Sequence, residues 1–303
     1  MSGLDEIEQA VARVAAQVGG SVVGIGRRSG RGSGIVYADG LVVTNAHNLR
    51  GDEVTVVFAD GRSAVGQVRG VDVDGDLAVV AVDTGGAAPL AWADAPAGIG
   101  SAVFALANPG GRQQVTFGLV SAVDRAFRGP RGRRIAGSIE HTAPLARGSS
   151  GGPIVNRAGA LLGLNTNRLG DGFYLALPAD AELRRRIDAL ARGESPTTPR
   201  LGVGLAPARV ARRLRRAVGL PERDGLLVRV VEEGSPADRA GIRGGDLIVS
   251  AAGQPVAEID DLYQVLDGLA ADATLTLGLV RGTEERTVTV SFGAGGAQNV
   301  GMA

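Results

Sequence analysis

Short apolar runs rich in β-branched residues, separated by glycine-containing turns, fill most of the chain between Ser21 and Thr166. Glycine accounts for 48 of the 303 residues and aromatic residues for only 3%, which favours strands and tight turns over an aromatic-rich core. Many short strands at this spacing predict an all-β barrel or sandwich pair rather than βαβ units. The clearest runs are Ser21–Ile25, Gly34–Tyr37, Leu41–Thr44, Val54–Phe58, Leu77–Val82, Ala102–Leu106, Val115–Val123 and Leu161–Asn165.

Two helical segments flank this β-rich region. Apolar residues recur at helical spacing near the N-terminus, which predicts an amphipathic helix over residues 4–18. A second helix is expected over residues 179–192. Residues 193–200 contain two prolines and small polar residues that cannot build a core, so they are predicted to be a linker. We therefore expect a first domain over residues 1–192.

A second domain of mixed α and β structure is expected over residues 201–293. Residues 294–303 are rich in glycine and small residues and predict a disordered tail. Within the second domain the pattern predicts strands near 201–205, 226–231, 246–251, 273–280 and 286–292, and helices near 208–217, 236–240 and 259–269.

The composition excludes several kinds of chemistry. All 32 basic residues are arginine, so the chain has neither a Schiff-base lysine nor a Walker A loop. The absence of cysteine excludes disulfides, thiolate metal sites and cysteine nucleophiles, and two histidines, His47 and His141, make a multi-histidine metal site unexpected. The formal net charge is zero, so no nucleic-acid partner is expected.

The sequence predicts neither a membrane span nor an export signal. No apolar run approaches the roughly 18 residues that a span requires. The N-terminus carries Asp5, Glu6 and Glu8 where a signal peptide would be basic, and no apolar segment follows. The chain as written is expected to be cytoplasmic, with the alternative that an export segment has been removed.

Three segments supply the parts of an activated serine. Without cysteine and lysine, the remaining covalent nucleophiles are chiefly hydroxyls and carboxylates. A serine needs a neighbouring base, usually histidine, that a carboxylate orients. The three segments are Val42–His47, which ends in a histidine; Asp74–Val82, where Asp76 opens an apolar strand; and Arg147–Asn156, where Ser150 lies in a glycine turn.

These segments resemble the trypsin-like serine proteases, most closely the bacterial HtrA/Deg family, in the order His, Asp, Ser and in the phrases TNAH, GDLAVV and GSSGGPIVN. The second domain resembles a PDZ domain in its Leu201–Gly204 loop, in Gly234–Ile242 and in Gly245–Ile248. The resemblance covers about residues 20–293 and implies a mostly β fold: a chymotrypsin-like double β-barrel followed by an α+β PDZ domain.

The resemblance also implies roles for the site residues. His47 is expected to be the general base, Asp76 its orienting carboxylate and Ser150 the nucleophile, with the N–H groups of Gly148 and Ser150 forming the oxyanion hole. Such a triad needs no metal and no organic cofactor. The alternatives without catalysis are that Ser150 lies in a glycine-rich surface turn and that His47 is an ordinary histidine at the end of a strand.

The chain departs from the family pattern around the nucleophile. Ser149 stands where asparagine is common, Ala146-Arg147 replaces Asn-Pro, and His141-Thr142-Ala143 replaces Thr-Asp-Ala. These departures are the support for an alternative function, a catalytically inactive PDZ scaffold or chaperone that binds peptides.

Substrates and partners follow from the same resemblance. The chain is expected to be an ATP-independent serine endopeptidase that acts on unfolded or misfolded polypeptides in protein quality control. Pro144 is expected at the base of the primary specificity pocket, and because it is uncharged it predicts cleavage after small or medium aliphatic residues. The family's usual assembly, held by N-terminal aromatic residues, suggests a homotrimer, although this chain has no aromatic residue before Tyr37.

The PDZ domain is expected to bind C-terminal peptides and thereby to recruit substrate or regulate cleavage. Leu201, Gly202, Val203 and Gly204 are predicted to present backbone N–H groups to a terminal carboxylate, and the two glycines leave room for its approach. The alternative for this segment is an ordinary strand start.

Overall fold

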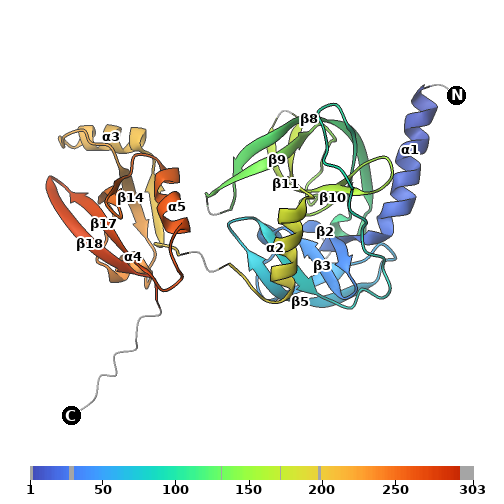
Figure 1. Ribbon diagram of the computed structural model, residues 1–303, viewed down its shortest axis with the longest axis horizontal. Coiled ribbons are helices and arrows are strands. Elements are labelled where there is room, and N and C mark those ends of the chain that lie inside the picture. Colours follow the sequence, from blue (N-terminus) through green and yellow to red (C-terminus); the bar gives the residue numbers. More distant parts are fainter. Residues whose placement is uncertain (1–2, 27–30, 131, 171, 197–198, 294–303) are drawn as a thin grey trace, which may run out of the picture. The chain divides into compact units, whose positions relative to one another are not determined.

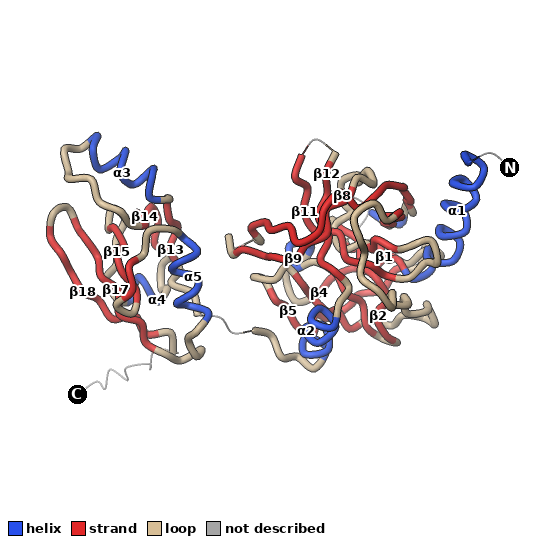
Figure 2. Tube along the Cα trace, turned by 45° about the horizontal axis from the view of Figure 1, so that its top comes forward, coloured by secondary structure: helices blue, strands red, loops and turns tan. Residues whose placement is uncertain are grey.

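The computed structural model describes residues 3–26, 31–130, 132–170, 172–196 and 199–293. It divides the chain into two compact units, Met1–Pro196 and Thr197–Ala303 (Figure 1). The first unit is built mainly from β-strands and the second combines a β-sheet with helices, as the sequence predicts (Figure 2). The tail expected over residues 294–303 lies outside the described residues, as do residues 197 and 198 of the expected linker.

The first unit consists of two closed antiparallel barrels of six strands each. The strand order is β1-β2-β3-β6-β5-β4 in the first barrel and β10-β11-β12-β9-β8-β7 in the second. The first barrel contains β1 (Val22–Ile25), β2 (Gly32–Ala38), β3 (Leu41–Thr44), β4 (Glu53–Val57), β5 (Ser63–Asp72) and β6 (Leu77–Ala81). The second contains β7 (Ala102–Ala107), β8 (Gln114–Arg128), β9 (Arg134–His141), β10 (Pro153–Val155), β11 (Leu161–Gly170) and β12 (Phe173–Pro178).

Consecutive apolar residues in these strands serve two different cores. Val22 and Ile35 belong to a core that residues of both barrels share. Their neighbours Val23 and Val36 belong to a core built from first-barrel residues alone. Because successive side chains of a strand point to opposite faces, both faces are buried, and the runs are continuously apolar rather than alternating.

Helix α1 (Gly3–Val18) joins the shared core only through its C-terminal half. Val14 and Val18 are buried in that core. Leu4 and Ile7, near the N-terminal end, are 73% and 42% exposed.

Helix α2 (Ala181–Ala191) closes the first unit and packs against β5 and β6. Asp180 caps its N-terminus, since the Asp180 carboxylate accepts a hydrogen bond of 2.8 Å from the N–H of Leu183. Ile187 and Leu190 are buried in the shared core.

The second unit is a six-stranded sheet with three helices. The strand order is β13-β14-β15-β17-β18, with β16 paired to β15, so β13 forms an edge of the described sheet. The strands are β13 (Val203–Ala206), β14 (Leu226–Val231), β15 (Leu247–Ala251), β16 (Gln254–Pro255), β17 (Thr274–Arg281) and β18 (Glu284–Ser291). The helices are α3 (Ala208–Ala217), α4 (Pro236–Arg239) and α5 (Ile259–Asp267).

Two of the strands that differ from the sequence-based expectation, β5 and β8, have an exposed face. β5 was not among the predicted runs, because exposed residues, most of them polar, alternate with partly buried ones and its two buried residues are Gly66 and Gly70. β8 continues to Arg128, beyond the run predicted to end at Val123, and pairs with β9 in a long hairpin. Among the described helices, none has the length and apolar character needed to cross a membrane.

Candidate active site

His47 and Asp76 are held side by side at the ends of first-barrel strands. His47 lies in a 3₁₀ turn, Ala46–Asn48, directly after β3, and Asp76 lies between β5 and β6. The Nδ1 atom of His47 is 2.9 Å from both carboxylate oxygens, and the backbone N–H of His47 donates to Oδ1 at 3.2 Å. The carboxylate is 2% exposed and the imidazole 37%. The buried carboxylate therefore fixes the Nδ1 edge of a ring that remains accessible.

The backbone of Asp76 adopts an unusual conformation. Its φ of 52° lies in the left-handed region, which few residues other than glycine adopt. The amide of Asn45 donates to the carbonyl of Asp76 at 2.9 Å and helps to hold this turn. The neighbouring carboxylates bind elsewhere: Asp72 pairs with Arg186 at 2.7 Å, and Asp74 pairs with Arg133 at 3.2 Å.

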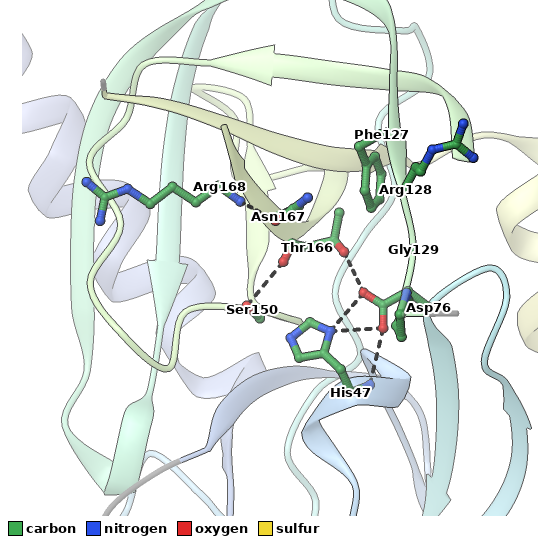
Figure 3. Close-up of a pocket in the computed structure, with 10 residues that line it drawn as sticks. His47, Asp76, Phe127, Arg128, Gly129, Ser150, Thr166, Asn167 and Arg168 are labelled. Carbon is green, nitrogen blue, oxygen red and sulfur yellow. Dashed lines mark hydrogen bonds and ion pairs between the residues drawn. The ribbon is translucent and has the colours of Figure 1, made fainter. Parts of the chain in front are cut away.

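Ser150 lies on the second barrel's side of the same site. In Figure 3 the ring of His47 lies between Ser150 and Asp76. The hydroxyl of Ser150 donates to the carbonyl of Thr166 at 3.2 Å. Among the described residues, this hydroxyl has no hydrogen bond with His47. The structure thus brings His47, Asp76 and Ser150 together, but the Ser150 hydroxyl is directed at the Thr166 carbonyl instead of at His47.

The loop before Ser150 leaves two backbone N–H groups available. Gly148 has a φ of +88°, and the hydroxyl of Ser33 donates to its carbonyl at 2.8 Å. The N–H of Ser33 donates to the carbonyl of Ser150, also at 2.8 Å. Within the part of the chain that the structure describes, the N–H groups of Gly148 and Ser150 make no hydrogen bond.

Thr166 is a site residue that the sequence did not indicate. Its hydroxyl donates to Oδ2 of Asp76 at 2.6 Å, and its side chain is buried. A β-bulge in β11 produces this contact, because the pairing with β12 shifts between Asn165 and Asn167 and leaves Thr166 as the extra residue. The only signal in the sequence is that Thr166 directly follows the predicted run Leu161–Asn165.

Two pockets flank Ser150. One, of about 410 Å³, is lined by His47, Asp76, Phe127, Arg128, Gly129, Pro130, Ser150, Thr166, Asn167 and Arg168. The other, of about 360 Å³, we call the arginine pocket; it is lined by Arg31, Leu145, Ala146, Arg147, Gly148, Ser149, Ser150, Asn165, Thr166, Asn167, Arg168 and Tyr174.

The expectation that Pro144 forms the base of the specificity pocket is wrong. Pro144 is exposed and lines neither pocket. Pro144 follows the buried Ala143, and Leu145 and the residues that follow form the wall of the arginine pocket. The preference for aliphatic residues that was inferred from Pro144 therefore loses its basis.

His141 lies behind the arginine pocket rather than in the catalytic cluster. It is fully buried, its Nε2 atom is 2.9 Å from Oδ1 of Asn165, and its ring stacks on Tyr174 at 5.8 Å between centroids. Burial lowers the pKa of His141 to about 4, and the hydrogen bond to Asn165 opposes this shift. His141 is therefore neutral near pH 7 and supports two pocket residues.

The substitutions in the loop leave it tightly turned. The N–H of Ser149 donates to the carbonyl of Ala146 at 3.3 Å, and the carbonyl of Ser149 accepts from Gly152 at 3.0 Å. Ser149 itself is 3% exposed, whereas Arg147 is exposed at the pocket rim. The departures from the family pattern therefore place an exposed Arg147 and a buried Ser149 among the residues that line the pocket.

The predicted peptide-binding loop of the second unit lies at the start of its edge strand. Gly202 has a φ of +77°, and a Cβ atom on it would lie 2.2 Å from that of Ser235. The carbonyls of Leu201 and Gly202 accept hydrogen bonds from Ala237 and Glu232. Their N–H groups make no hydrogen bond to any described residue. Val203 and Gly204 belong to β13, so the segment is partly loop and partly strand.

Known families match both units. Residues 32–164 match the trypsin-like peptidase domain, and residues 227–281 match the PDZ domain. The protein named "Putative serine protease HhoA" of Synechocystis sp. is 36% identical over 280 residues that cover 87% of this chain and 71% of HhoA. The chloroplastic Protease Do-like 1 of Arabidopsis thaliana is 30% identical over 87% of this chain and 63% of its own length.

Solved structures share the fold. The HtrA-type protease AlgW with a decapeptide aligns with a TM-score of 0.63 and 23% identity, over 93% of this chain and 97% of that chain. AlgW with a tripeptide aligns with a TM-score of 0.56 and 26% identity, over 92% and 95%. The chain spans only about half the length of several DegP-like relatives that it also matches.

Proposed function

The chain belongs to the HtrA family of trypsin-like serine proteases and combines a trypsin-like peptidase domain with a PDZ domain, and from this premise we propose that it is an ATP-independent serine endopeptidase acting on unfolded polypeptides. The observation that carries the proposal is the buried Asp76 carboxylate 2.9 Å from Nδ1 of an accessible His47, with Ser150 on the other side of the ring.

In the proposed reaction, Ser150 attacks the substrate carbonyl and His47 accepts the serine proton through Nε2. The hydroxyl must first leave the carbonyl of Thr166. An extended substrate paired along β11 offers a backbone N–H to that carbonyl, which releases the hydroxyl toward His47. Asp76 holds the imidazole in the required tautomer and stabilises the imidazolium that forms.

The N–H groups of Gly148 and Ser150 are the proposed oxyanion hole. Ser33 holds the carbonyls of both residues, and their N–H groups are free of partners among the described residues. Donors fixed before the reaction stabilise the developing negative charge without reorganisation.

Digestion of casein tests this proposal against the inactive scaffold. We expect the native protein to cleave casein and Ser150→Ala to lose nearly all cleavage, because the nucleophile is gone. Ser63→Ala is the matched control, since it removes the hydroxyl of an exposed serine that lines neither pocket. Cleavage by Ser150→Ala would refute the nucleophile, and an inert native protein would favour the scaffold.

The second unit is proposed to capture the C-terminal carboxylate of a peptide at Leu201, Gly202, Val203 and Gly204. Support comes from the free N–H groups of Leu201 and Gly202 and from the unpaired edge of β13 in the described sheet. A free-acid peptide should bind severalfold more tightly than its amide, because amidation removes the charge. Equal affinities in isothermal titration calorimetry would refute this assignment.

The homotrimer remains part of the proposal. The exposed apolar side chains of Leu4 and Ile7 on α1 offer a surface for association between copies. Light scattering should then give three times the chain mass of 30.7 kDa. The mass of a single chain would contradict the trimer.

A further inference from the structure

The arginine pocket carries positive charge beside the proposed nucleophile. Arg31, Arg147 and Arg168 line it, and no Asp or Glu does. These three arginines come from three separate segments of the chain: Arg31 directly precedes β2, Arg147 lies in the loop before Ser150, and Arg168 lies in β11. Three cations without a carboxylate among the lining residues create a potential that attracts an anionic group.

None of the three guanidinium groups forms an ion pair with a carboxylate among the described residues. Arg31 and Arg147 form no ion pair with any described residue. The guanidinium of Arg168 lies over the ring of Tyr174, with Cζ 5.7 Å from the centroid, and has no described carboxylate partner. By contrast, Arg125 and Arg133, in the β8–β9 hairpin of the same barrel, pair with Glu140 and Asp74.

The geometry of the site identifies which part of a substrate reaches this pocket. Consider a substrate whose reacting carbonyl lies at the N–H groups of Gly148 and Ser150 and whose chain pairs along Thr166–Arg168 of β11. The side chain of the residue that carries this carbonyl then points between β11 and the loop 145–150. That space is the arginine pocket. In Figure 3 the side chain of Arg168 extends away from His47 and Asp76. The pocket therefore receives the side chain on the amino side of the cleaved bond.

We propose that the arginine pocket selects an acidic side chain, Asp or Glu, immediately before the cleaved bond. The inference rests on the proposed protease function and specifies its substrate. Guanidinium groups bind carboxylates through paired N–H donors, and Arg168 is the central partner because it lines both pockets beside Ser150. Leu145 and Tyr174 supply apolar surface for the methylene groups of a glutamate.

The expected preference is moderate and sensitive to salt. All three arginines are exposed, so each contact with a carboxylate is weakened by solvent and screened by ions. Together they should favour Glu over the uncharged isostere Gln by about tenfold in kcat/KM at low salt. A substrate with lysine at this position should be the poorest because the cations repel it.

The test uses the full chain and peptides that differ only at the residue before the cleaved bond: Glu, Gln, Leu or Lys. We expect the ratio of kcat/KM for Glu over Gln to be about ten and to approach one in about 0.5 M NaCl. Arg168→Gln should lower this ratio severalfold, and the triple change Arg31→Gln, Arg147→Gln, Arg168→Gln should bring it to about one. Arg157→Gln is the control, because Arg157 is exposed and lines neither pocket.

The outcomes separate this inference from the proposed function. Cleavage that depends on Ser150 but favours Leu or shows no preference for Glu over Gln would overturn the acidic specificity and leave the protease function intact. Loss of the ratio in Arg157→Gln would also overturn it, since the effect would then come from general surface charge. Mass spectrometry of casein fragments gives a second readout, in which acidic residues should precede the cuts. If none of the substrates is cleaved, both the protease function and this inference fall.

Discussion

The hydroxyl of Ser33 connects the two barrels at the loop that carries Ser150. It donates to the carbonyl of Gly148 at 2.8 Å and accepts from the N–H of Asn108 at 2.9 Å, and Ser33 is fully buried. Gly32 lies against Asn48 so closely that a Cβ atom would come within 2.2 Å of it. The close approach of these segments fixes the carbonyls of Gly148 and Ser150, to which Ser33 donates, and thereby the direction of the N–H groups of Gly148 and Ser150.

Replacing Ser33 with alanine should therefore impair turnover more than substrate binding. We expect kcat to fall about tenfold or more with little change in KM, because the oxyanion donors lose their fixed orientation. Ser21→Ala is the matched control, since the hydroxyl of Ser21 is also buried and donates to a carbonyl, that of Ala88, at 2.7 Å. Both variants should lose about 1–2 kcal/mol in the free energy of unfolding. An unchanged kcat for Ser33→Ala would contradict the positioning role.

His141 should make the first unit sensitive to acid. Its pKa is about 4 in the folded protein and near 6.5 in the unfolded chain, so between these values the unfolded chain binds more protons. The free energy of unfolding that depends on a neutral His141 is therefore fully present above about pH 6.5 and is lost as the pH falls toward 4. The shift corresponds to about 3 kcal/mol.

The variant His141→Gln removes this titration while keeping a polar side chain for Asn165. Urea unfolding can be followed by the fluorescence of Trp92, the single tryptophan of the chain, which reports on the first unit. Between pH 6.5 and pH 4, the native protein should lose about 3 kcal/mol more stability than the variant. Parallel losses in both proteins would show that His141 does not titrate in this way.

The sequence identifies residues whose chemistry is rare in this chain, but not residues whose role comes from a tertiary contact. His47 and Ser150 could be predicted because the chain has only two histidines, and because a histidine, an aspartate and a serine occur in order in three recognisable segments. Thr166 and Ser33 could not, since their partners lie 90 and 115 positions away in the sequence. Hydroxyl residues of this kind are common in strands, and nothing local marks these two.

At the level of elements, the bulge in β11 gives the Asp76 carboxylate its hydrogen bond from Thr166. The extra residue turns the Thr166 hydroxyl toward Oδ2 of Asp76. Strand prediction from apolar runs places β11 but cannot place a bulge, because the pairing shift depends on β12. The hairpin of β8 and β9 was underestimated for a related reason, since its outer part is exposed and its residues do not form an apolar run.

Thr166→Val tests the contribution of this bulge. Valine keeps the shape of threonine but removes the hydrogen bond to Asp76, so the carboxylate loses one of its donors. We expect kcat to fall about tenfold to a hundredfold, while Thr166→Ser, which keeps the hydroxyl, should stay within about threefold of the native rate. Equal losses in the two variants would indicate a packing effect instead.

At the level of the whole molecule, each unit has hydrophobic clusters of its own. The first unit contains the core shared by both barrels, the core of the first barrel, and a core of the second barrel that includes Val103 and Ile154. The second contains a separate core with Leu226, Val228 and Leu277. Because neither unit draws its core from the other, the proposed catalytic cluster should remain assembled when the second unit is removed.

Deletion of residues 198–303 therefore separates catalysis from its proposed regulation. We expect the shortened chain to keep the Trp92 fluorescence of the folded first unit and to cleave a short peptide substrate. A free-acid peptide bound by the loop Leu201–Gly204 should change the rate of the full chain severalfold and should have no effect on the shortened one. The amidated peptide is the control in both proteins, since it lacks the carboxylate that the loop is proposed to bind. A response that survives the deletion would show that the peptide acts on the first unit directly, because the loop Leu201–Gly204 would be gone.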